Sequence, residues 1–204
     1  MNAPYGIGSR DYLGRAKKLL SDSSCESMFY AALELRCGTE ARMREYLEVA
    51  DEICQKKKQG WQIAKLGNDL ERAFKVGDRI VQITFENMTT GKQCRTYYTP
   101  VSSKLRKQAE CMGDYLHALK TYREPDNDWW KTLRVFLNET FEALSAATRG
   151  TLLGPPLFRP GGKRLKTHHE IGVDSASDEA MRTIAGAGAT VTIDVQYFDK
   201  LPVE

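Results

Sequence analysis

Hydrophobic residues recur along this chain with two different periods, and the period changes near Arg79. Apolar positions three and four residues apart are typical of amphipathic helices. They predict helices over 11–20, 25–57, 61–74, 102–122 and 129–148, with a short one after Ser177. Alternation with a period of two predicts β-strands instead, over 79–86, 93–99 and 189–198.

The predicted helix over 25–57 is the longest, and its apolar arc is wide. The arc holds eight residues on a helical wheel: Phe29, Ala32, Leu33, Met43, Tyr46, Leu47, Ala50 and Ile53. A wide arc predicts a central helix that packs on more than one neighbour. Arg36 and Glu40 lie inside it, one turn apart, where they can pair with each other. We interpret them as a structural ion pair or as a polar site in a helical groove or partner interface.

Three predicted strands suggest one small sheet. The two strands within 79–99 are joined by a short segment that contains Gly91, which is typical of a β-hairpin. An isolated hairpin is marginally stable in water, so we expect the strand over 189–198 to pair with it. The predicted fold is therefore α+β and mostly helical, with two long helices and a small antiparallel sheet. We expect one domain over 1–204, with 79–99 as an inserted hairpin.

Composition agrees with an ordinary globular chain. Its 204 residues are 41% hydrophobic and 28% charged, and the net charge is only +3. This mild charge does not by itself favour a nucleic-acid partner. No apolar run reaches the roughly 18 residues that cross a bilayer, and the first residues lack a signal-peptide pattern. We therefore expect a cytoplasmic protein with no membrane partner.

The cysteines and histidines do not form a recognisable metal or cofactor motif. The five cysteines are odd in number and include no Cys-x-x-Cys pair, which argues against a disulfide framework and a zinc site. Lys92 follows a glycine, but the remaining residues of a phosphate-binding loop are missing. His168 and His169 are adjacent and would point apart in extended chain. We expect no metal and no cofactor.

The stretch over 150–176 has no periodicity and is locally basic. Loops of this length are uncommon unless they are functional or disordered. We predict that it contacts a protein or nucleic-acid partner through its basic residues, which are Arg159, Lys163, Arg164, Lys166 and His168.

A family resemblance adds a second hypothesis. The segments AKKLL and MFYAALELRCGTEARMREYL, with Ala31-Ala32, Leu33-Glu34-Leu35 and Glu40, resemble the helical hairpin of the HEPN superfamily. These are small helical domains found in toxin–antitoxin and antiviral systems, and many are RNases. The family signature is an arginine followed, after four to six residues, by a histidine. Arg164 and His169 match it, and the resemblance implies that they act on a ribose 2′-hydroxyl and the scissile phosphate.

Three functions are therefore open from the sequence. The first is a non-enzymatic module that binds a protein or a nucleic acid, RNA more than DNA, within a bacterial defence or toxin–antitoxin assembly. The second is a HEPN-like, metal-independent RNase that uses Arg164 and His169. The third is a structural homodimer held through the apolar arc of the helix over 25–57.

Overall fold

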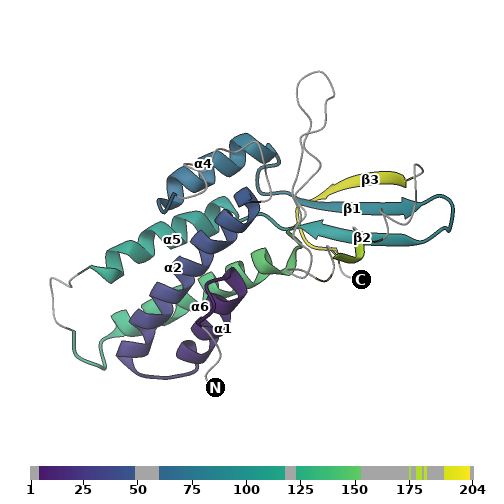
Figure 1. The fold of residues 1–204 in the computed structure, drawn as a ribbon. Helices are drawn as coiled ribbons and strands as arrows, with labels where there is room; N and C mark the ends of the chain where they lie inside the picture. The colour runs from purple at the N-terminus through teal and green to yellow at the C-terminus, as the bar shows by residue number, and fades with distance from the viewer. Residues whose placement is uncertain are drawn as a thin grey trace. The chain divides into compact units, whose positions relative to one another are not determined.

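The fold is α+β and mostly helical, with one small antiparallel sheet, as the sequence predicted. The computed structural model describes residues 5–48, 60–117, 123–152, 175, 178–180, 182 and 191–202. Its helices are α1 (Ser9–Leu20), α2 (Cys25–Glu48), α4 (Ile63–Phe74), α5 (Ser103–Leu116) and α6 (Asp128–Arg149). Its strands are β1 (Ile80–Asn87), β2 (Gln93–Tyr98) and β3 (Val191–Phe198) (Figure 1).

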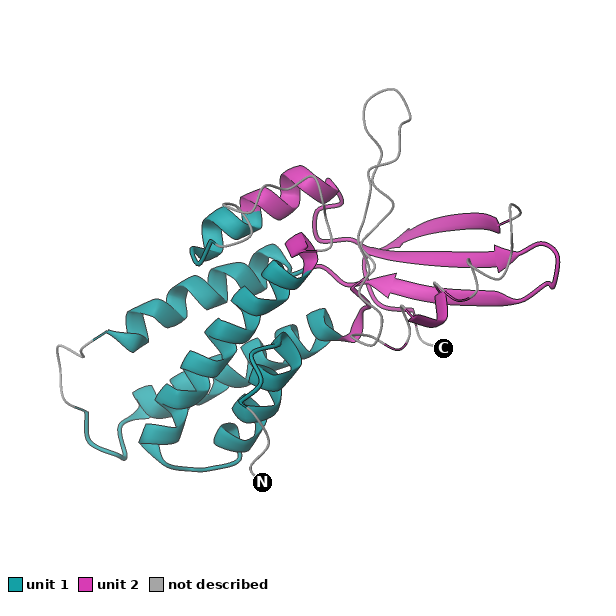
Figure 2. Ribbon diagram, in the orientation of Figure 1, with its two compact units in different colours: residues 1–45, 60–67, 101–148 teal, residues 46–59, 68–100, 149–204 magenta. Residues whose placement is uncertain are grey.

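The chain divides into two compact units (Figure 2). Unit 1 comprises Met1–Glu45, Gly60–Gly67 and Val101–Thr148, and unit 2 comprises Tyr46–Gln59, Asn68–Pro100 and Arg149–Glu204. The division falls inside two helices, because α2 contains both Glu45 and Tyr46 and α4 contains both Gly67 and Asn68. The expected single domain over 1–204, with 79–99 as an insertion, stays a prediction.

Within unit 1, α2 is a central helix, as its wide apolar arc predicted. Its fully buried residues include Ala31, Ala32, Leu35 and Met43. The backbone approaches its neighbours closely at Gly38, where an added Cβ would lie 2.9 Å from Leu144 Cδ2 of α6 and 3.0 Å from Tyr12 Cβ of α1.

Burial along α2 departs in part from the predicted arc. Leu33, placed on the apolar arc, is 45% exposed, whereas Ala31, Leu35 and Ala41, which were not placed on it, are buried. The physical reason is that α1, α5 and α6 all contact α2, so burial follows the positions of these neighbours and not the average polarity of each face.

A buried arginine that the apolar pattern did not single out ties α2 to both neighbouring helix ends. Arg42 is 1% exposed, and its Nε donates to the Ala147 carbonyl of α6 at 3.0 Å. Its Nη1 donates to Glu45 Oε2 at 3.2 Å. Glu45 also accepts from the backbone N–H and the hydroxyl of Ser9 at the start of α1, at 2.6 and 2.7 Å.

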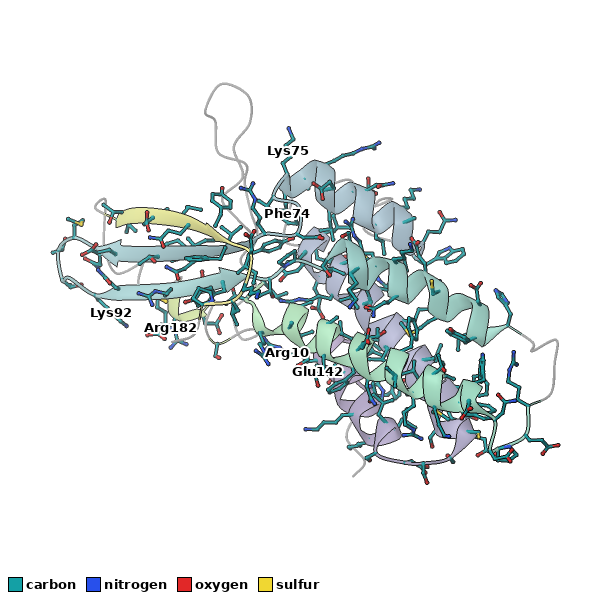
Figure 3. The ribbon with its side chains drawn as sticks, turned by 180° about the vertical axis from the view of Figure 1, so that it is seen from behind. Arg10, Phe74, Lys75, Lys92, Glu142 and Arg182 are labelled. Atoms are coloured by element: carbon teal, nitrogen blue, oxygen red, sulfur yellow. The ribbon has the colours of Figure 1, made fainter. Side chains whose placement is uncertain are left out.

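Arg10 adds a second cation at the end of α6. Its guanidinium donates to the Thr148 carbonyl at 3.2 and 3.3 Å. Figure 3 labels the Arg10 side chain. Positive charge suits a helix C-terminus and negative charge an N-terminus, so both arginines and Glu45 complement the helix dipoles that they meet.

Unit 2 contains the three-stranded sheet, in the order β2-β1-β3. The expected pairing of the C-terminal strand with the hairpin is confirmed, because β1 pairs antiparallel with both β2 and β3. The register places Val81, Ile83 and Phe85 on one face of β1. The same face continues in β2 through Cys94, Thr96 and Tyr98 and in β3 through Val191, Ile193, Val195 and Tyr197.

Aromatic rings fill the part of unit 2 next to the start of β1 and the end of β2. Tyr46 lies 4.7 Å from Tyr98 and 6.2 Å from Phe74 between ring centroids, and its hydroxyl donates to the Thr99 carbonyl at 2.8 Å. After α6 the chain passes this region at Gly150, where an added Cβ would lie 2.7 Å from the Tyr97 carbonyl oxygen. Only a residue without a side chain fits there without a shift of the backbone.

Candidate functional site

The predicted basic contact residues and the predicted catalytic pair lie outside the described residues. These are Arg159, Lys163, Arg164, Lys166, His168 and His169. Their proposed contacts, and the convergence of Arg164 with His169, therefore stay predictions. Across the described ranges, no group of three or more His, Cys, Asp or Glu side chains could hold a metal ion. None of the helices described is long and apolar enough to span a membrane.

Arg36 and Glu40 lie on α2 as predicted, but each makes its hydrogen bond with a different group. Arg36 Nη1 donates to the Ala109 carbonyl of α5 at 2.8 Å, and Glu40 Oε1 accepts from Arg44 Nη2 at 2.7 Å. Burial raises the pKa of the Glu40 carboxyl, against the opposing effects of Arg44 and Arg36. These contacts tie α2 to α5 and hold Arg44 on the same helix, which is a structural arrangement.

A cluster of five aromatic side chains in unit 1 is the most distinctive surface feature of the described chain. We call Phe29, Tyr115, Trp129, Trp130 and Phe136 the aromatic cluster. Ring centroids lie 5.6 Å apart for Phe29 and Trp130, 4.9 Å for Trp129 and Trp130, 5.8 Å for Tyr115 and Trp129, and 5.8 Å for Tyr115 and Phe136. Three of these contacts are edge-on, an arrangement that stabilises aromatic pairs beyond the area they bury.

The turn before α6 positions the two tryptophans. The Asn127 side-chain oxygen accepts from the Trp129 N–H at 2.9 Å, and the Asn127 carbonyl accepts from the Trp130 N–H at 3.0 Å. Such bonds satisfy N–H groups that have no partner within the helix. The Trp130 indole N–H donates to the Glu124 carbonyl at 3.0 Å, and the Arg123 guanidinium lies 4.2 Å from the Trp129 ring centroid.

The cluster is open to solvent. All five rings are only partly buried, whereas apolar side chains in the interior of unit 1, such as Leu133 and Leu137, are buried. Further exposed apolar residues are near the cluster in the chain: Tyr30 and Leu33 follow Phe29 on α2, and Leu116 follows Tyr115 on α5. Large apolar side chains that gather at the surface mark an interaction site more often than single, scattered ones do.

Acidic side chains flank the aromatic cluster. Glu26 precedes Phe29 by one turn, Asp114 adjoins Tyr115, and Asp128 adjoins Trp129. With Glu124 and Asp126 of the turn before α6, they form what we call the acidic rim, and all five are exposed. Among the described residues, the nearby cations are already engaged: Arg123 lies over Trp129, and Lys131 pairs with Asp128 at 2.8 Å.

The apolar pattern predicted the helix over 129–148 but did not identify this surface. The signal was present in the two adjacent tryptophans after the turn EPDND. Adjacent positions on a helix point about 100° apart, so Trp129 and Trp130 cannot both enter one narrow core stripe. No family model, curated protein or solved structure matches this chain.

Proposed function

We propose that this chain is a non-enzymatic module that binds a partner protein through the aromatic cluster. The observation that carries the proposal is the group of partly buried rings, two of them tryptophan, with Arg123 against Trp129. Tryptophan, tyrosine and arginine are the residues that contribute most often to the energetic centre of a protein interface.

The acidic rim favours a protein over a nucleic acid. Stacking on aromatic rings also binds single-stranded nucleic acid, but that binding combines stacking with a positively charged groove. The rim has five carboxylates, and the nearby cations Arg123, Lys131 and Arg134 already have partners. Phosphates would therefore be repelled. The partner that fits is a protein segment that presents apolar side chains flanked by lysine or arginine.

The proposal is tested by capturing a partner from cells of the source organism and measuring its binding after purification. Two substituted variants are compared with the wild-type chain. Trp129→Ala should weaken binding by about 2 kcal/mol or more, roughly thirty-fold, as expected for a central interface residue. Asp126→Lys should slow association and reduce its dependence on salt. Val135→Ala, an exposed apolar position on α6 outside the cluster, is the matched control and should leave binding unchanged.

The outcomes separate the alternatives. Capture of RNA in place of protein would favour the nucleic-acid interpretation, and a partner bound equally well by Trp129→Ala would place the interface elsewhere. Thermal unfolding by circular dichroism should show that both variants remain folded. The HEPN-like RNase hypothesis rests on Arg164 and His169 and stays a separate prediction, as do the expected cytoplasmic location and a role in a defence or toxin–antitoxin assembly.

A further inference from the structure

Among the residues that the structure describes, the outer edge of β3 has no partner strand, because the sheet has the order β2-β1-β3. Its backbone directions follow from one hydrogen bond at the opposite edge. The Tyr97 carbonyl accepts from the Thr151 N–H at 2.8 Å, so the backbone groups of Tyr97 point away from β1. The backbone N–H and C=O groups of successive residues in a strand point to alternate sides. The backbone groups of Tyr98, Thr96 and Cys94 therefore bond to β1.

The same alternation continues across β1. The partners Val81, Ile83 and Phe85 direct their backbone groups to β2, and the residues between them direct theirs to β3. These intervening residues pair with Thr192, Asp194 and Gln196. The free N–H and C=O groups of β3 therefore belong to the alternate residues Val191, Ile193, Val195 and Tyr197.

This edge lacks most of the features that usually protect a strand from pairing. Natural edge strands are short, bulged, covered by another segment, or carry charged side chains or proline, and Asp194 is the one charged residue of β3. β3 has eight residues in a continuous register with β1 and contains neither lysine nor proline. All of its residues are at least partly exposed, and Tyr197 is 50% exposed although it lies on the apolar face of the sheet. An additional strand would extend the sheet at this edge and pair with these backbone groups.

We propose that the occupant of this edge is β3 of a second copy of the chain, antiparallel, with Val195 on the two-fold axis. In this register Ile193 lies opposite Tyr197, which pairs a β-branched residue with an aromatic ring, and Asp194 lies opposite Gln196, which can donate a hydrogen bond to it. Such cross-strand pairs stabilise a sheet. The pairs 193–197, 195–195 and 197–193 each exchange two backbone hydrogen bonds, and the apolar face becomes continuous across the axis.

The two registers centred on the preceding residues fit less well, which favours Val195 over Asp194 and Ile193. Placing Asp194 on the axis would set two carboxylates directly opposite each other, which destabilises the pairing. Placing Ile193 on the axis would shift Tyr197 and Phe198 beyond the start of the partner's β3 at Val191. The inference does not depend on the aromatic cluster, which belongs to unit 1, whereas β3 belongs to unit 2.

Cysteine cross-linking tests the register directly. Disulfides form when the two Cα atoms lie about 4.4–6.8 Å apart, and directly opposed antiparallel residues lie at about 4.5–5.5 Å. Val195→Cys should therefore form a covalent dimer on mild oxidation, while Asp194→Cys and Ile193→Cys should form little, as should the wild-type chain with its own cysteines. Preferential cross-linking at 194 or 193, or equal cross-linking at all three, would overturn the proposed register.

Light scattering on the full chain tests the dimer itself. The wild-type protein should reach twice the 23.0 kDa of one chain as its concentration rises, and Val195→Pro should remain monomeric. The Val195 N–H points outward, and proline is tolerated on an edge strand where the N–H faces solvent, so circular dichroism should show that this variant is folded. A wild-type monomer at every concentration, or a dimer that Val195→Pro does not weaken, would rule out the proposal.

Discussion

At the scale of single residues, two charged side chains of α2 behave differently because their surroundings differ. Arg42 is buried and bonded to a helix-end carbonyl and to Glu45. Glu40 is partly buried beside Arg44, and its pKa is raised because burial outweighs the two nearby arginines. The charge of Glu40 is therefore held in the folded chain at some cost, while that of Arg42 is closely matched by its partners.

The raised pKa of Glu40 predicts a pH dependence of stability. An unperturbed glutamate has a pKa of 4.5, and in the folded chain the Glu40 carboxyl stays protonated above that pH. Between pH 4.5 and the raised folded pKa, the folded state therefore binds more protons than the unfolded state. The contribution of Glu40 to the free energy of unfolding should therefore fall as the pH rises from 4.5 to the raised folded pKa. Glu40→Gln removes this dependence, so the stability of wild type relative to the variant should decrease over the window.

Urea denaturation at several pH values measures this difference. Glu142→Gln, at an exposed position of α6, is the matched control for the loss of one carboxylate. If the wild type instead gained stability relative to Glu40→Gln as the pH rises through this window, the assignment would be wrong.

At the scale of elements, the ends of the helices in unit 1 are joined by side chains of other helices. Arg42 of α2 and Arg10 of α1 bond to the last carbonyls of α6, and Glu45 of α2 bonds to the first N–H of α1. The last carbonyls of a helix have no partner within it, so these contacts satisfy polar groups and fix which helix ends meet.

Arg42→Met should destabilise the chain by about 3 kcal/mol, because removing a buried cation leaves the Ala147 carbonyl and Glu45 without their partner. Arg44→Met is the control on the same helix. The Arg44 side chain is 42% exposed, against 2% for Arg42, so solvent screens its charge and its removal should cost about 1 kcal/mol or less. Chemical denaturation gives both values, and equal losses for the two variants would show that burial does not set the strength of these contacts.

At the scale of the whole molecule, two continuous helices connect the two units. α2 and α4 each contribute residues to both, so the unfolding of either unit would shorten both helices. Small single domains usually unfold in one cooperative transition. We therefore expect both units to unfold in a single cooperative transition.

Ile83→Ala in β1 tests this coupling. Ile83 is buried in the sheet of unit 2, and truncating a buried isoleucine costs about 2–5 kcal/mol. All three tryptophans, Trp61, Trp129 and Trp130, belong to unit 1. The unfolding midpoint reported by tryptophan fluorescence should fall together with that reported by circular dichroism. A fluorescence midpoint unchanged by the substitution would show that unit 1 unfolds alone.

Much of the fold followed from local pattern. Alternation predicted a strand over 189–198, and its described part, 191–198, is β3. The marginal stability of a hairpin predicted that this strand would pair with it, as it does. Helix ends were predicted less well at the long helix 102–122, since α5 ends at Leu116. Hydrophobic periodicity depends only on the residues of one segment, so it can be recognised without knowledge of the rest of the chain.

The surfaces could not be predicted in the same way. Arg36 and Glu40 are one turn apart, which suggested a mutual pair, yet Arg36 bonds to Ala109, 73 positions away. The aromatic cluster brings Phe29 of α2 together with Tyr115 of α5 and the tryptophans of α6. Contacts between residues this far apart in the sequence depend on how the elements pack, and the spacing of residues within one segment does not predict them.

The sequence by itself determined the kinds of elements, their order and the apolar face of each strand, because these depend on the period of side chains along one segment. Only the tertiary structure decided that Arg42 is buried against the end of α6, that two tryptophans stay partly exposed near acidic side chains, and that β3 is an edge strand of the sheet formed by the described residues. Those properties depend on which distant segments meet, and that is set by the packing of the whole chain.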